Sequence, residues 1–124
     1  MIQAPGFPVR SPVPIELAPI VFRPNGVSAP LDVGGFVTSV ARSGVGVFQV
    51  IIPDQGIMIG RPHGRITGNT ASIVVVVDSY VAATRTLQVT LRDASAAYAA
   101  LDVTAATETY VILLYVFKPN VSQP

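Results

Sequence analysis

Apolar residues occur along this chain in strand-sized groups, separated by Gly, Pro, Ser and Asp. The clearest group is 85–92, where polar and apolar residues alternate strictly from Thr86 onward. Side chains of a strand point alternately to its two faces, so this pattern predicts a half-buried strand. Leu87, Val89 and Leu91 should face inward, and Thr86, Gln88, Thr90 and Arg92 should face solvent.

A β-hairpin is predicted at residues 35–42 and 46–52. Gly44 and Gly46 permit positive φ in the short loop between the two strands. The residues that follow, 53–56, have the composition of a turn. Residues 60–69 contain three glycines and are predicted to be a loop, and the Val-rich stretch 71–79 is predicted to be a fully buried strand.

The stretch 109–117 predicts a strand with two apolar faces, too short to cross a membrane as a helix. Val111, Leu113, Tyr115 and Phe117 share one face. The opposite face carries Tyr110, Ile112, Leu114 and Val116, which we predict to form an oligomer interface. A strand of a two-sheet sandwich needs only one apolar face, so the second requires a cover. Either another subunit or the chain's own N-terminal segment can supply it.

Residues 1–34 are interpreted as an extended, proline-rich N-terminal arm that contains seven of the eleven prolines. Proline fixes φ and removes a backbone donor, which excludes a helix and disfavours a central strand. Within this arm, residues 15–23 are compatible with an edge strand. Residues 1–14 are the better candidate for reaching a neighbouring subunit. The predicted anchors of the arm are its large apolar side chains Phe7, Val9, Val13 and Ile15.

The predicted fold class is all-β: a single β-sandwich or jelly-roll-like domain at 35–118, with the arm before it and a tail at 119–124. Six to eight short strands are expected, with no long amphipathic helix. The alanine-rich stretch after Asp93 is open to two interpretations. It can form a short helical turn at 94–101 or a loop with a short strand around 99–103.

Composition favours a protein that buries extra apolar surface against a partner. The chain has 124 residues, half of them hydrophobic, with a net charge of +1. No basic run suits nucleic acid or an anionic membrane, so neither is expected as a partner. The chain has no cysteine, and its N-terminus lacks the pattern of a secretory signal. Synthesis in the cytoplasm is therefore expected.

Few residues are suited to catalysis. His63 is the only histidine, and no spacing typical of a metal site surrounds it. We therefore predict no enzyme activity, no metal and no cofactor. Arg61, His63 and Arg65 in the predicted loop are candidate contacts for a phosphate, a sugar or an acidic surface, although the near-zero net charge favours solvated loop charges as the explanation. Together with Tyr80 and Tyr98 they define the alternative function, a carbohydrate- or receptor-binding β-domain of a phage fibre.

The arm, the hairpin Phe36–Ile52, the Val-rich strands and the closing strand Tyr110–Phe117 together resemble the capsid decoration (cement) proteins of tailed phages. The resemblance covers about half of the chain and includes no catalytic or binding motif. It implies a structural virion protein on the capsid surface, made in the host cytoplasm. It also implies a homotrimer whose arm contacts a neighbouring subunit or the shell. The implied partners are the chain itself and the major capsid protein or another virion protein.

Overall fold

The computed structural model describes residues 15–68, 72–103 and 109–119. These residues form nine strands and one 3-10 turn, and all strand pairs are antiparallel. The elements are β1 (Glu16–Asn25), β2 (Ser28–Gly35), β3 (Ser39–Gly44), β4 (Val47–Ile51), β5 (Gly56–Ile66), β6 (Ile73–Val81), β7 (Thr86–Asp93), η1 (Ala94–Ala96), β8 (Ala99–Ala100) and β9 (Val111–Pro119).

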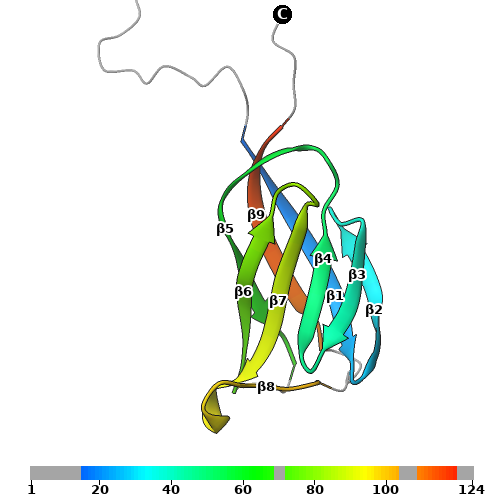
Figure 1. Ribbon diagram of the computed structural model, residues 1–124, viewed down its shortest axis with the longest axis vertical. Helices are drawn as coiled ribbons and strands as arrows, with labels where there is room; N and C mark the ends of the chain where they lie inside the picture. Colours follow the sequence, from blue (N-terminus) through cyan, green and yellow to red (C-terminus); the bar gives the residue numbers. More distant parts are fainter. Residues whose placement is uncertain (1–14, 69–71, 104–108, 120–124) are drawn as a thin grey trace, which may run out of the picture.

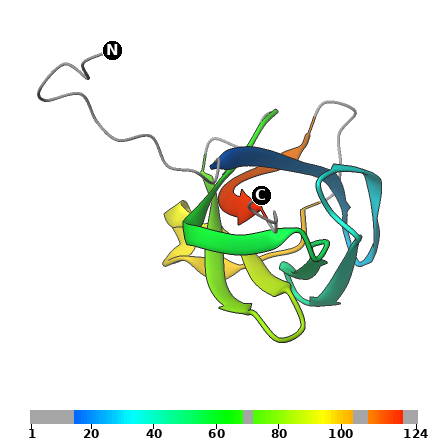
Figure 2. The same ribbon diagram turned by 90° about the horizontal axis from the view of Figure 1, so that it is seen from above.

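The strands form two sheets that pack face to face (Figure 1). One sheet has the order β2-β1-β9-β5, and the other has β3-β4-β7-β6 with the short β8 beside β7. Seen along the long axis, the sheets curl around a shared interior (Figure 2). The predicted all-β sandwich is therefore confirmed. No helix in the described part of the chain is long and apolar enough to span a membrane.

The core lies between the sheets and uses alternate residues of each inner strand. Leu87, Val89 and Leu91 of β7 are fully buried, as their alternation predicts. Phe22 of β1 and Phe48 of β4 meet across the two sheets with ring centroids 4.9 Å apart. The remaining buried apolar residues are Ala18, Ile20, Val50, Ile52, Val77, Val111, Leu113, Tyr115 and Phe117.

The hydroxyl of Tyr115 is the polar end of this core. It donates a hydrogen bond to the carbonyl oxygen of Phe36 at 3.2 Å and accepts one from the side-chain amide of Gln55. Burial raises the pKa of Tyr115 above its ordinary value. The hydroxyl therefore stays protonated and ties the loops after β2 and β4 to β9.

The expectation that 15–23 forms an edge strand is wrong, because β1 lies between β2 and β9. Its prolines are tolerated because of where they lie. The carbonyl oxygen of Pro19 accepts a hydrogen bond from the backbone N–H of Phe36, just past the end of β2. Pro19 has no N–H to donate on that side, but β2 has already ended there, so no hydrogen bond of the ladder is lost. Pro24 lies beyond Phe22, the last residue of β1 that pairs with β9. Because β1 and β2 form a hairpin, residues 16–35 belong to the sandwich rather than to an arm.

Other local predictions have mixed outcomes. The hairpin of β3 and β4 forms as expected. Residues 60–66 were predicted to be a loop but are part of β5. The stretch 71–79 was predicted to be a fully buried strand, but β6 is a half-buried edge strand, because it has a neighbour on one side only. After Asp93, a 3-10 turn at 94–96 is followed by β8, so each interpretation holds for part of the stretch. The anchors Phe7, Val9 and Val13 lie outside the described residues.

Replacing the buried ring of Phe48 should test the inter-sheet core. Phe48→Ala should lower the free energy of unfolding by about 3–5 kcal/mol, because it removes the partner of Phe22 and leaves a cavity. Urea denaturation followed by circular dichroism measures this loss. Val27→Ala, in the exposed turn between β1 and β2, is the control and should change stability by less than about 0.5 kcal/mol. Equal effects of the two variants would contradict this assignment of the core.

Candidate functional site

The outer face of the β2-β1-β9-β5 sheet is apolar. Cross-strand partners point to the same face, and the pairs Leu17↔Val116, Pro19↔Leu114 and Ile59↔Val116 lie opposite the core side. Leu17 is 61% exposed, Ile57 is 67% exposed and Leu114 is 38% exposed. We call this surface the outer apolar face; it consists of Leu17, Pro19, Val21, Ile57, Ile59, Ile112, Leu114 and Val116.

The four residues predicted as an interface belong to this side of β9. Ile112, Leu114 and Val116 are part of the outer apolar face, and each retains some solvent exposure. Tyr110 precedes β9, and the guanidinium of Arg23 lies 5.8 Å from its ring centroid. The strand therefore has the two apolar faces that its sequence predicts. One face is in the core, and the other is accessible within the described structure.

Basic side chains border the outer apolar face. His63 pairs with Leu114, and Arg65 pairs with Ile112, so both lie on this face along β5. Lys118 points the same way at the end of β9, opposite Ile57. His63 and Arg65 were predicted to be loop residues, and that prediction is wrong, because β5 continues through them. The bulk of the face is apolar and its β5 border is basic.

The second sheet differs in its outer surface, which carries a row of hydrogen-bonded polar groups. Gln88 of β7 donates to the carboxylate of Asp78 at 3.3 Å and accepts from Gln49 at 3.3 Å. Thr90 donates to the same carboxylate and is only 1% exposed. Thr90 was expected to face solvent; the side chains around it cover it instead. The outer surface of the second sheet is therefore mixed, because the partly exposed Val47, Ile51, Val74 and Val76 lie on the same side as these polar groups.

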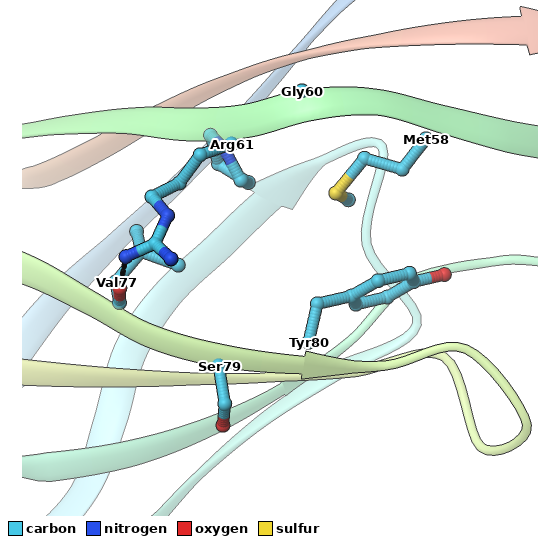
Figure 3. A pocket seen from close by; sticks show the side chains of 7 residues that line it. Met58, Gly60, Arg61, Val77, Ser79 and Tyr80 are labelled. Carbon is cyan, nitrogen blue, oxygen red and sulfur yellow. Dashed lines mark hydrogen bonds between the residues drawn. The ribbon is translucent and has the colours of Figure 1, made fainter.

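A pocket of about 300 Å³ opens between β5 and β6, the edge strands of the two sheets. Met58 and Tyr80 extend toward each other from these strands, and Arg61 reaches toward Val77 (Figure 3). Arg61 donates a hydrogen bond to the carbonyl oxygen of Val77 at 3.3 Å. Arg61 and Tyr80 are thus brought together as candidate ligand contacts.

The rest of the predicted binding face does not assemble. His63 and Arg65 lie on the outer apolar face, away from this pocket. Tyr98 follows η1, and its carbonyl oxygen accepts a hydrogen bond from Arg92 at 3.1 Å. The five residues of the alternative hypothesis are therefore divided among three places, because the register break in β5 and the turn after β7 separate them.

Sequence reasoning missed an ion pair between Arg42 of β3 and Asp102. Two guanidinium nitrogens of Arg42 donate to the two carboxylate oxygens of Asp102 at 2.9 and 2.7 Å. The backbone N–H of Gly46 donates to the same carboxylate at 2.9 Å. The hydrogen bond from Arg42 lowers the pKa of Asp102, and the Gly46 N–H contributes. A pair separated by 60 residues has no local sequence pattern that would predict it.

Asp102→Asn should destabilise the protein at neutral pH, lowering the melting temperature by a few degrees, because it breaks the paired hydrogen bonds. Folding lowers the pKa of Asp102, so the ionised carboxylate stabilises the folded protein. This contribution to stability is fully present above the unfolded-state pKa of about 3.9, and it disappears as the pH falls through the folded-state pKa. The difference between the two proteins should therefore shrink below about pH 4. Thermal melts from pH 2.5 to 7 measure it.

Asp32→Asn is a matched control for this charge change. Asp32 pairs with Arg23 at 2.9 Å, but its side chain is largely exposed, and surface ion pairs contribute little. Its positive φ of 51° is also one that asparagine tolerates well. A loss of stability equal to that of Asp102→Asn would contradict the special role of the Arg42–Asp102 pair.

The described residues contain no group of three or more His, Cys, Asp or Glu side chains that could hold a metal ion. No protein-family model, curated protein or solved structure matches the chain. The outer apolar face and the edge pocket are therefore the features on which a functional proposal has to rest.

Proposed function

We propose that this chain is a structural, non-enzymatic virion protein: a capsid decoration protein that forms a homo-oligomer through its outer apolar face and binds a capsid shell. The observation that carries this proposal is the exposed apolar surface shared by β1, β9 and β5. The trimeric state and the shell partner come from the resemblance of the chain to decoration proteins. The occupant we assign to the face is a second copy of this chain.

The size of the face supports this assignment. The three strands of the face lie about 4.8 Å apart, and about seven residues in each at about 3.4 Å make a face of roughly 14 by 24 Å. Side-chain relief raises the accessible surface to several hundred Å² per subunit, less than the ~800 Å² that each partner buries in a standard interface. At ~25 cal/mol per Å², burial of several hundred Å² contributes roughly 10 kcal/mol before the entropic cost of association.

The difference between the two outer surfaces supports a closed oligomer. The second sheet presents the polar row around Asp78, whose groups are already hydrogen-bonded to one another. The outer apolar face is therefore the surface that we assign to association. Association through this face favours a closed assembly over an open-ended filament, and in a trimer two different parts of the face meet around the three-fold axis.

The outer apolar face can be tested with a charge at its centre. Wild-type protein should elute as a trimer at micromolar concentration in size-exclusion chromatography with light scattering. Leu114→Lys should shift the protein to monomer, because burying an unpaired ammonium costs several kcal/mol. Val81→Lys is the control: Val81 is also exposed but lies on β6 of the other sheet, so the trimer should persist. A monomeric wild type at micromolar concentration would count against the proposal.

Deletion of residues 1–14 tests the role of the predicted arm in shell binding. The truncated protein should keep its fold, because all the described strands lie between Glu16 and Pro119. It should bind shells of the major capsid protein encoded in the same genome at least about ten-fold more weakly, since apolar anchors are lost. Co-sedimentation measures binding, and circular dichroism checks the fold. Unchanged binding would show that the arm does not contact the shell.

A further inference from the structure

We propose that the pocket between β5 and β6 is a binding site for a small organic carboxylate with an apolar or aromatic body. This inference goes beyond the proposed function and is independent of it. The pocket is lined by Met58, Gly60, Arg61, Pro62, Val77, Ser79 and Tyr80. None of these residues belongs to the outer apolar face. Oligomerisation and ligand binding therefore use different residues.

An irregularity in β5 creates the site. The pairing of β5 with β9 passes from Ile59↔Val116 to His63↔Leu114, so four steps along β5 match two along β9. Gly60, Arg61 and Pro62 thus stand opposite the single residue Tyr115, which makes two residues extra. They form a bulge, and bulges redirect side chains out of the regular alternation. Gly60 adopts φ +70°, a conformation that glycine accepts without strain. Arg61 is thereby directed to the sheet edge and toward β6.

The charge of the pocket selects an anion. Arg61 is the only charged residue among those that line it. Within the described part of the chain, no salt bridge involves Arg61. The carboxylate of Asp78, although on β6, bonds to Thr90 and Gln88 of β7. The hydrogen bond from Arg61 to the Val77 carbonyl oxygen uses only one of the five guanidinium N–H groups of Arg61. The other donors remain for a planar carboxylate.

The rest of the lining selects an apolar body. Met58, Pro62 and Val77 supply aliphatic surface, and the half-buried ring of Tyr80 supplies an aromatic wall (Figure 3). The only side-chain hydroxyls are those of Ser79 and Tyr80. A neutral sugar would leave most of its hydroxyl groups without partners, which disfavours it. A volume of about 300 Å³ is at the lower end of the range for small-molecule sites and suits a single ring.

Titration of the full-length protein with benzoate tests the proposal. In NMR spectra, the backbone amide signals of β5 and β6 around the pocket should shift until the site is saturated with benzoate. The dissociation constant should be roughly millimolar, as expected for a fragment. Benzamide has the same ring without the charge and should bind at least about ten-fold more weakly. N-acetylneuraminic acid carries a carboxylate on a hydroxylated ring and should also bind more weakly than benzoate. Tighter binding of this acidic sugar would overturn the assignment of an apolar body.

Two arginine variants locate the site. Arg61→Gln should weaken benzoate binding at least about ten-fold, while Arg65→Gln should leave it unchanged. Both substitutions remove one positive charge from β5, but Arg65 lies on the outer apolar face. The proposal would be overturned if both variants lost benzoate affinity equally. It would also be overturned if no amide signal shifted saturably, or if the shifts were confined to β1 and β9. Because Arg61→Gln leaves the outer apolar face intact, its oligomeric state reports separately on the proposed function.

Discussion

The pairing of β1 with β9 is the constraint on which the rest of the sandwich depends. Seven consecutive residue pairs, from Glu16↔Phe117 to Phe22↔Val111, join strands from opposite ends of the described chain. Without this ladder, the first sheet would separate into the hairpin of β1 and β2 and the pair of β5 and β9. The ladder also brings Ile20 and Phe22 beside Leu113 and Val111 in the core. Contacts between such distant segments close large loops, which slows folding.

The same ladder creates the surface that we assign to oligomerisation. Strands with two apolar faces usually lie in the middle of covered sheets, because each face needs burial. In this protein β1 and β9 each have two apolar faces, and they are neighbours in the sheet. The residues that alternate with their core residues therefore lie together on the outer apolar face. Leu17, Pro19 and Leu114 are exposed as a direct consequence of the register that buries Ala18, Ile20 and Leu113. A shift of one residue in this register would therefore exchange the core and the outer apolar face along these strands.

Local patterns were sufficient to predict part of this structure. The alternation in β7, the hairpin of β3 and β4 and the two apolar faces of β9 depend on neighbouring residues, and all three are present. The interior position of β1 was not predictable, because whether a proline interrupts a ladder depends on where the neighbouring strand ends. The Arg42–Asp102 pair and the β5–β6 pocket depend on contacts between distant segments. No local spacing indicates them.

The three basic residues of β5 show how backbone register determines the surface on which a side chain lies. Arg61, His63 and Arg65 are spaced by two, so in a regular strand all three would share one face. The bulge at 60–62 separates them: His63 and Arg65 stay on the outer apolar face, and Arg61 turns to the sheet edge. One short basic run thus contributes to two surfaces of different chemistry. A basic border suits macromolecular contact, whereas a single arginine between Met58 and Tyr80 suits a small anion. The extra residues of this bulge, more than the number of charges, determine on which surface each basic residue of β5 lies.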